Sequence, residues 1–221
     1  MAGAVAKEIG EAIRSALAAR GHALIALPGG KSPTPVFEKL ATKSLDWNRV
    51  TVLPTDDRLV SPEDPLSNVG MIAQHFLPCG AKVLPIAVAN IKDYRAAGKA
   101  ADRSLARLDW PPDLVWIGVG QDGHTASIFR GPDFEEALDG TESCRAVGVM
   151  PDPLPPEAPV ARVTLSGAAI LSARELVLAF SGIEKRAVVE KAIEEGRRSN
   201  LPIGRLLAET KRPIEIHWSA A

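Results

Sequence analysis

Residues 113–131 constrain the fold more strongly than any other part of the sequence. They begin with Leu114-Val115-Trp116-Ile117, a short apolar run of the kind that forms a buried strand. The run breaks into a turn with three glycines, which leads to Asp122 and His124. In open α/β sheets, ligands bind outside the carboxyl ends of the strands. We therefore expect a central strand followed by a loop that presents functional side chains.

His124 suits a general base, because an imidazole ordinarily titrates near neutral pH. Asp122 lies two residues earlier and is a candidate for orienting the ring or holding a water. A tight turn in which Asp122 acts as a cap and His124 is incidental explains the same residues. Short glycine-rich motifs often match by chance, so the spacing alone leaves both interpretations open.

Gly118, Gly120 and Gly123 also match G-x-G-x-x-G, the fingerprint of a dinucleotide-binding turn. That fingerprint requires a long crossover helix after the third glycine and an acidic residue about 20 positions further on. Pro132 interrupts the segment within about two helical turns, and Glu142, near the expected offset, lies in a polar stretch typical of a turn. The pattern favours an anion site over a dinucleotide site.

Strand patterns and helical patterns alternate along the chain, which predicts an α/β fold with a mostly parallel, Rossmann-like sheet covered by helices on both faces. Residues 1–221 are expected to form a single domain. Helical spacing is clearest over 3–20 and 92–108, and further helices are expected after residues 35, 68, 167 and 182 and near 203. The predicted strands are 23–27, 50–53, 83–86, 114–117, 145–150, 162–165, 175–180 and 214–218.

Gly29, Gly30, Lys31 and Ser32 lie between the first predicted strand and a helix. Free backbone N–H groups and the positive end of a helix dipole favour an anion at such a place. Lys31 adds a positive charge, and Ser32 can donate a hydrogen bond. Ordinary N-capping of the helix by Ser or Thr explains the same residues.

Charged residues follow two more of the predicted strands. Asp56, Asp57 and Arg58 come after the second strand and form a second candidate site loop, although an exposed charged loop would have the same composition. Lys185 comes after strand 175–180, in the first turn of a helix. The carboxyl ends of parallel strands meet at one edge, so we expect these loops and His124 to form one site.

The formal net charge is −1, with 26 Lys and Arg against 27 Asp and Glu. No overall basic field indicates nucleic acid or an anionic membrane as a partner. No apolar run reaches transmembrane length and no signal-peptide pattern is present, so we expect a cytoplasmic protein. Cys79 and Cys144 are expected to be free thiols. Isolated histidines (His22, His75, His217) lack the spacing of metal ligands.

Taken together, the motifs resemble a known family. Segment 28–33 is similar to a Gly-Gly-x-Thr-Pro loop, and segment 56–60 to Asp-Glu-Arg-x-Val. Segment 118–129 is close to Gly-x-Gly-x-Asp-Gly-His-Thr-Ala-Ser-Leu-Phe, and segments 162–165 and 182–185 match later landmarks. These are the landmarks of the glucosamine-6-phosphate isomerase/6-phosphogluconolactonase family, and the chain resembles its 6-phosphogluconolactonases from about residue 5 to 218.

The resemblance implies hydrolysis of 6-phospho-D-glucono-1,5-lactone to 6-phospho-D-gluconate in the pentose phosphate pathway, without metal or cofactor. It implies that His124 is the general base on water and that Asp122 assists it. Ser32 in place of Thr and Asp57 in place of Glu are departures from the family pattern. The residues implied to bind the substrate or its phosphate are Gly29, Gly30, Lys31, Ser32, Asp56, Arg58, Arg162 and Lys185.

Two related functions are alternatives. Glucosamine-6-phosphate deaminases, which are aldose–ketose isomerases, share the Asp-Gly-His core but carry a segment like Ile-Ala-Phe-Asn-Glu-Pro after it. Segment 125–129 here has no such Glu, which favours lactone hydrolysis. Non-catalytic sugar-phosphate sensors of this fold usually carry a DNA-binding helix-turn-helix, and we expect the sheet domain to take up all 221 residues. We expect a monomer or a small homo-oligomer.

Overall fold

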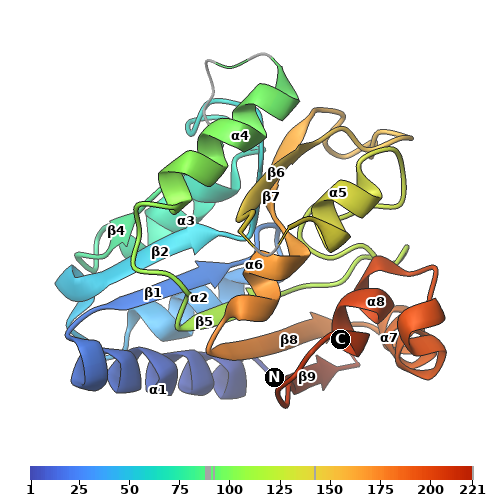
Figure 1. Cartoon of the computed structure of the whole chain (residues 1–221). Coiled ribbons are helices and arrows are strands. Elements are labelled where there is room, and N and C mark those ends of the chain that lie inside the picture. The colour runs from blue at the N-terminus through green and yellow to red at the C-terminus, as the bar shows by residue number, and fades with distance from the viewer. Residues whose placement is uncertain (88–90, 92, 142, 221) are drawn as a thin grey trace.

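The computed structural model describes residues 1–87, 91, 93–141 and 143–220, and Figure 1 shows their arrangement. Glu142 and residue 92, the expected start of a helix, lie outside the described residues. The α-helices are α1 (Ala2–Arg20), α2 (Thr34–Ala41), α3 (Asn68–Phe76), α4 (Tyr94–Leu105), α5 (Phe134–Asp139), α6 (Gly167–Ser172), α7 (Ile183–Glu195) and α8 (Pro202–Ala208). The strands are β1 (Ala23–Leu27), β2 (Val50–Pro54), β3 (Asp56–Arg58), β4 (Lys82–Val83), β5 (Leu114–Ile117), β6 (Ala146–Val149), β7 (Arg162–Leu165), β8 (Glu175–Ser181) and β9 (Glu215–Ser219).

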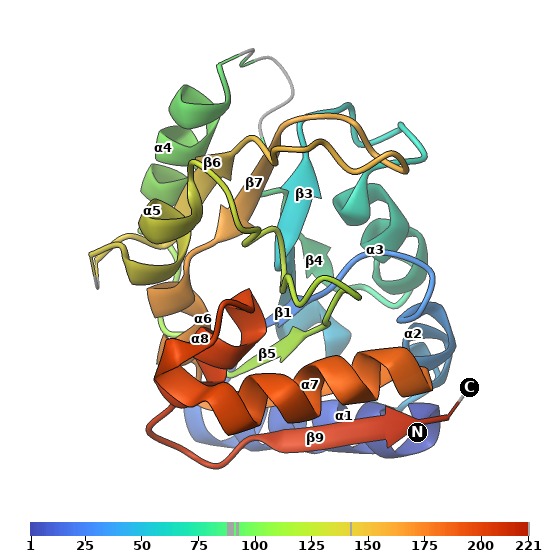
Figure 2. The ribbon, with the colours of Figure 1, turned by 90° about the vertical axis from the view of Figure 1, so that its right-hand side faces the viewer.

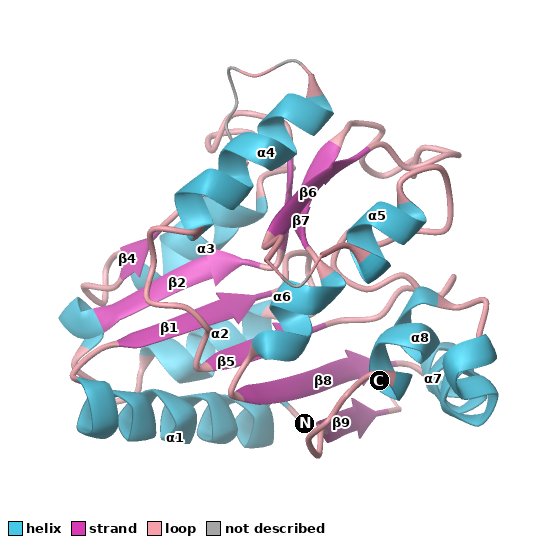
Figure 3. Ribbon diagram, viewed as in Figure 1, coloured by secondary structure: helices cyan, strands magenta, loops and turns pink. Residues whose placement is uncertain are grey.

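In the described part of the chain, the strands form two sheets (Figure 3). The larger sheet has the order β4-β2-β1-β5-β8-β9, and each neighbouring pair is parallel. The smaller sheet has the order β3-β7-β6, and its pairs are antiparallel. The predicted parallel α/β sheet is confirmed. The antiparallel sheet was not predicted, because strand patterns do not reveal which strands leave the main sheet.

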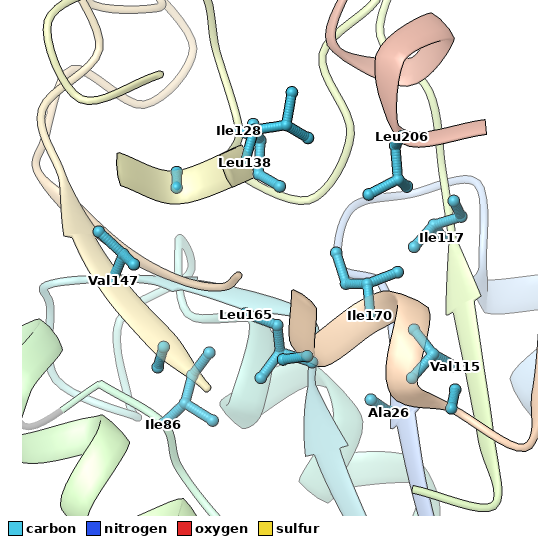
Figure 4. Packing of buried hydrophobic residues seen from close by; sticks show 14 of the residues in the cluster. Ala26, Ile86, Val115, Ile117, Ile128, Leu138, Val147, Leu165, Ile170 and Leu206 are labelled. Atoms are coloured by element: carbon cyan, nitrogen blue, oxygen red, sulfur yellow. The ribbon is translucent and has the colours of Figure 1, made fainter. Parts of the chain in front are cut away.

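The two faces of the larger sheet are covered by different layers. Successive side chains along a strand point to opposite faces. Alternate residues of β1 accordingly pack on one face with α1, α2 and α3, and on the other with α4, α6, α8 and the smaller sheet. The expected helices on both faces are confirmed. Figure 4 shows part of the hydrophobic cluster on the face with α4, α6, α8 and the smaller sheet. In it, Ile170 of α6 lies among Leu165 of β7 and Val115 and Ile117 of β5.

Local signals set several element ends. α1 ends at Arg20 and is followed by Gly21, whose φ of 78° is left-handed and suits glycine. α3 begins after Ser67, whose hydroxyl accepts a hydrogen bond from Gly70 N at 3.1 Å. At the other end of the chain, β9 lies beside α7 (Figure 2), with Trp218 Nε1 donating to the Gly182 carbonyl at 3.1 Å. α4 differs from its predicted range only at its ends. The prediction of a strand over 83–86 is largely wrong, because β4 covers Lys82–Val83 and shares only Val83 with it.

The prediction of a loop over 56–58 is wrong, because these residues form β3. Thr55 makes the transition: its N–H donates to Leu27 O in the larger sheet at 2.9 Å, and its carbonyl accepts from Leu165 N in β7 at 2.8 Å. The main chain therefore leaves the parallel sheet at Thr55 and pairs at once with β7. The charged residues that looked like an exposed loop are held on a strand instead.

Two further sequence expectations concern the environment of the chain. None of the described helices is long and apolar enough to cross a membrane. Cys79 and Cys144 are free, as predicted.

The smaller sheet is fixed against α4 by a backbone contact at Gly98. A Cβ at this position would lie 2.0 Å from the backbone nitrogen of Gly148 in β6, which is far inside van der Waals contact. The neighbouring atoms belong to the main chain, so they cannot rotate away as a side chain would. Gly98 thus sets the distance between α4 and the sheet that carries part of the site.

Gly98→Ala is expected to lower the free energy of unfolding by at least about 2 kcal/mol, because the added methyl group forces α4 away from β6. Gly3→Ala in α1 is the control, since a Cβ there meets nothing within 4 Å. Better helix propensity should make that variant as stable as the wild type or more so, by up to about 1 kcal/mol. Urea unfolding measures both, and an unchanged midpoint for Gly98→Ala would contradict the close contact.

Candidate functional site

A pocket of about 230 Å³ lies at the carboxyl ends of β1, β5 and β8, with β3 and β7 contributing to its wall. The loops expected at one edge do lie together there. The predicted residues that line the pocket are Gly29, Gly30, Lys31, Ser32, Asp56, Arg58, His124, Arg162 and Lys185. Asp122 is outside the described lining and contacts His124 instead.

The pocket is strongly cationic. Among its described lining residues, four side chains are cationic (Lys31, Arg58, Arg162 and Lys185) and one, Asp56, is a carboxylate. With His124 neutral, the local balance is 4 − 1 = +3, whereas the formal net charge of the chain is −1. Cations concentrated in a cleft attract an anion and raise its local concentration. The pocket is therefore suited to an anionic ligand of small size.

Asp122 holds one ring nitrogen of His124. The Asp122 Oδ1 atom lies 2.5 Å from His124 Nδ1 and also accepts from the His124 backbone N–H at 3.2 Å. Gly120 makes room for this pair, since a Cβ there would lie 2.2 Å from Nδ1. Because Nδ1 is occupied by the carboxylate, Nε2 is the ring nitrogen that remains for other chemistry.

The charge of Asp122 is supported by the same contacts. Partial loss of solvent raises the pKa of its carboxyl, but the hydrogen bonds and the proximity of His124 outweigh this effect and leave the pKa below its ordinary value. The carboxylate therefore stays ionised at neutral pH. An ionised acceptor at Nδ1 favours the tautomer in which that nitrogen carries the hydrogen.

The chain beyond Gly123 does not form a dinucleotide-binding turn. None of the described residues between Gly123 and the start of α5 at Phe134 is helical. Thr125 and Ile128 instead close a short bridge, with Ile128 N donating to Thr125 O at 2.9 Å. The crossover helix that the dinucleotide fingerprint requires is thus missing from this part of the chain.

The loop after β1 exposes backbone groups to the pocket. Gly29 allows Asn68 to approach, because a Cβ at Gly29 would lie 1.9 Å from Asn68 Oδ1. Gly30 has a φ of 90°, which favours glycine. α2 begins after Pro33 without a side-chain cap. N-capping by Ser32 or Thr34, the alternative interpretation of this loop, is therefore wrong.

Asp56 and Arg162 are linked through a buried serine. Ser127 Oγ donates to Asp56 Oδ2 at 2.5 Å and accepts from Arg162 Nη1 at 3.4 Å. Arg162 is only 2% exposed. Burial lowers the pKa of this guanidinium, and the nearby Asp56 carboxylate opposes that effect. The buried cation is thus balanced in part by Asp56, through Ser127.

Arg58 and Arg162 are direct partners across the antiparallel pair β3–β7. Arg58 Nη1 donates to Leu66 O at 2.8 Å and to Asn68 Oδ1 at 3.1 Å, and Arg162 Nη2 donates to Ala158 O at 3.2 Å. The Nε atoms of both arginines are buried without a hydrogen-bond partner among the described residues. Like charges placed opposite each other repel, and an anion in the pocket would offset this repulsion.

Asp57 has a different environment from Asp56. Its carboxylate accepts from the backbone N–H groups of Asn68 at 2.7 Å, Val69 at 3.0 Å and Arg58 at 2.8 Å. Burial raises the pKa of Asp57, and these three donors oppose the rise. It is 1% exposed and lies outside the described lining of the pocket. Asp57 therefore caps the start of α3 and connects it to β3.

Sequence reasoning missed several residues of the pocket. Asn68 was not among the predicted site residues, yet its side chain accepts from Arg58 Nη1 and donates to Asp56 O at 2.7 Å. Its spacing after segment 56–60 was the available signal. Trp116, Val119, Ala126, Ala179 and Phe180 also line the pocket and carry no chemical signal in the sequence.

A metal site is not apparent in this region. Among the described residues, no group of three or more His, Cys, Asp or Glu side chains is arranged to hold a metal ion. The polar groups that face the pocket are cations, hydroxyls, amides, one carboxylate and one imidazole.

Comparisons with known proteins agree with this geometry. The chain matches the family model described as glucosamine-6-phosphate isomerases/6-phosphogluconolactonase over residues 1–218. It is 34% identical to the 6-phosphogluconolactonase of Pseudomonas putida, over 99% of this chain and 88% of that protein. For the 6-phosphogluconolactonase of Rhizobium meliloti (strain 1021) the values are 35%, 99% and 94%. The crystal structure of a 6-phosphogluconolactonase from Shewanella baltica OS155 is similar with a TM-score of 0.90 and 32% identity, covering 99% of this chain and 93% of that one. The chain therefore belongs to the family of glucosamine-6-phosphate isomerases and 6-phosphogluconolactonases.

Proposed function

We propose that the protein hydrolyses 6-phospho-D-glucono-1,5-lactone to 6-phospho-D-gluconate. The observation that carries this proposal is the Asp122–His124 pair at the edge of a small cationic pocket. A lactone is an activated ester, so a positioned base and stabilisation of the oxyanion suffice to add water to it. The lactonases among the relatives support the same reaction.

The phosphate of the substrate is assigned to the β1 side of the pocket. Lys31 and Ser32 lie before α2, and Lys185 lies in the first turn of α7. Helix N-termini present free N–H groups and a positive dipole end to an anion. A lysine in a first turn is unfavourable for the dipole, and a bound phosphate would offset that cost. Gly29 and Gly30 allow the main chain to come close to it.

The lactone ring is assigned to the side of His124. The imidazole Nε2 takes a proton from water while the water oxygen bonds to C1, and the carbonyl oxygen becomes an oxyanion. The C1–ring oxygen bond then breaks, and His124 returns the proton to the departing ring oxygen. Asp122 keeps Nδ1 as the donor throughout, so that Nε2 can exchange the proton.

The oxyanion is assigned to the arginines of the smaller sheet. Arg58 and Arg162 both line the pocket, and each has an Nε without a partner among the described residues. Arg162 is close to the His124 side, since both residues contact the ring of Phe129. We therefore assign Arg162 to the lactone carbonyl rather than to the phosphate, with Arg58 and Asn68 beside it. Asp56 holds Arg162 through Ser127.

The chemistry fits a protein of the cytoplasm. Its substrate would be a phosphorylated metabolite, and its two cysteines are free, as is usual in a reducing compartment.

The proposed function is tested by adding the purified protein to freshly made 6-phosphogluconolactone and following 6-phosphogluconate formation. The rate should rise well above the spontaneous rate and stay proportional to the protein concentration. Glucosamine-6-phosphate is assayed beside it, with ammonia as the readout. Ammonia release without lactone hydrolysis would replace the proposal with a deaminase function. If the protein binds 6-phosphogluconolactone and glucosamine-6-phosphate but converts neither, a sensor function would replace it.

His124→Gln is expected to lower kcat by about 10²–10⁴-fold, because an amide cannot take a proton from water at neutral pH. The thermal unfolding midpoint should change little, since the imidazole is partly exposed. His22→Gln is the matched control: His22 also lies next to a carboxylate, with Nε2 3.4 Å from Asp109 Oδ2, but outside the described lining of the pocket. A His124→Gln enzyme within a few-fold of the wild type would show that another group is the base.

The role of His124 as general base also predicts how kcat/KM depends on pH. kcat/KM should fall as the pH is lowered and the imidazole becomes protonated, after subtraction of the spontaneous hydrolysis. The pKa of Asp122 lies below its ordinary value, so this carboxylate remains ionised across that range. The acidic limb should therefore follow one titration and disappear in His124→Gln.

Lys185→Ala is expected to raise KM by on the order of 10–100-fold with a much smaller change in kcat, because a charge-assisted hydrogen bond to the phosphate is lost. The effect should be weak for glucono-1,5-lactone, which has no phosphate. Lys191→Ala is the control on the same helix, where the exposed Lys191 pairs with Glu195 at 3.8 Å. Equal losses on both substrates would mean that Lys185 does not hold the phosphate.

A further inference from the structure

The hydrogen bond to Asp122 does not by itself fix the ring of His124. Asp122 has a side-chain exposure of 61%, and exposed ion pairs hold their partners weakly. One hydrogen bond at Nδ1 also leaves the ring able to tilt through coupled changes in its χ1 and χ2 angles, which would move Nε2 away from the water that it must activate. A second contact has to define the plane of the ring.

Phe129 provides this second contact. Its ring stacks on the imidazole with centroids 4.3 Å apart and an interplanar angle of 27°. Near-parallel stacking restricts the tilt of the ring, and the hydrogen bond to Asp122 restricts its rotation about the Cβ–Cγ bond. Together the two contacts determine where Nε2 points.

The same phenyl ring also contacts the buried cation. Arg162 Cζ lies over Phe129 at 4.9 Å from the centroid, within the range of a cation–π interaction. Arg162 donates to Ser127 Oγ and Ala158 O, while its Nε has no partner among the described residues. One aromatic ring thus touches both the proposed base and the proposed electrostatic partner of the oxyanion.

The turn after His124 brings Phe129 back to the histidine. Thr125 Oγ1 donates to Gly118 O at 2.8 Å, and the Thr125–Ile128 bridge reverses the chain. Ala126, between them, has a φ of 49°, which is uncommon for a residue with a side chain. Phe129 stands outside the described lining of the substrate pocket. Its ring contacts His124 and Arg162, so it is placed to act on the site through these two neighbours.

We propose that Phe129 is a positioning residue whose aromatic ring holds the imidazole of His124 and the guanidinium of Arg162 in a fixed relation to each other. This inference rests on the proposed function, since it assigns those two groups to the same reaction. It requires an aromatic ring at position 129, because an aliphatic side chain can fill the volume but offers no π face to either partner.

Phe129→Leu tests the requirement for a ring. Displacing reacting groups by about 1 Å costs up to about 10²-fold in rate, so kcat should fall by on the order of 10–10²-fold while KM changes far less. Phe129→Tyr keeps the ring and should stay within a few-fold of the wild type. Phe134→Leu is the matched control, because Arg205 Cζ lies over the half-buried Phe134 ring at 5.2 Å, outside the described pocket lining. It should keep the wild-type kcat.

A spectroscopic readout separates positioning from packing. In the wild type, the ¹⁵N signals of His124, assigned by their loss in His124→Gln, should show one tautomer with hydrogen on Nδ1. In Phe129→Leu they should shift towards a mixture of tautomers, and in Phe129→Tyr they should not. Thermal unfolding is measured for each variant, and Phe129→Met replaces Phe129→Leu if the latter does not fold.

Wild-type kcat and tautomer in the folded aliphatic variant would overturn the proposal, and so would equal losses in Phe129→Leu and Phe129→Tyr. If the wild type does not hydrolyse the lactone at all, the proposed function fails. The ¹⁵N signals then still decide whether Phe129 positions the imidazole.

Discussion

The departure of the main chain from the parallel sheet at Thr55 is the constraint on which the site depends. A single residue bonds to Leu27 in one sheet and to Leu165 in the other. This places Asp56 and Arg58 on a strand directly above the carboxyl ends of the larger sheet, opposite Arg162. Without this change of sheet, the parallel strands would supply a phosphate site and a histidine but no wall of charged groups facing them.

The surrounding structure holds the charged residues of β3 and β7 close together in spite of the repulsion between the two arginines. Two arginines face each other across β3 and β7, and one of them is almost completely buried. Asp56, Ser127, Asn68 and backbone carbonyls satisfy part of their hydrogen-bonding capacity. The repulsion that remains favours binding of an anion. Proteins commonly place such costs at functional sites, where the ligand offsets them.

The local and the long-range parts of the site were not equally visible in the sequence. Asp122 and His124 belong to one turn, and the loop of Gly29 and Gly30 directly precedes a helix, so motif and spacing were enough to predict them. Asp56 and Arg58 were singled out as charged residues but were assigned to a loop. The pairing that makes them a strand involves residues more than 100 positions away, and no local pattern encodes it. The contact between Phe129 and Arg162 was also hidden, because it joins two segments that no local pattern relates.

The sequence by itself determined the alternation of strands and helices, the parallel sheet, and the loops that follow its strands, because hydrophobic periodicity and glycine-rich turns are local properties. It also determined the family, through short motifs that keep their order along the chain. The tertiary structure decided how the adjacent Asp56 and Asp57 differ: Asp57 caps α3, and Asp56 balances Arg162 through Ser127. These carboxylates are alike in sequence, and they differ only in the burial and hydrogen-bond donors that distant segments bring to each of them.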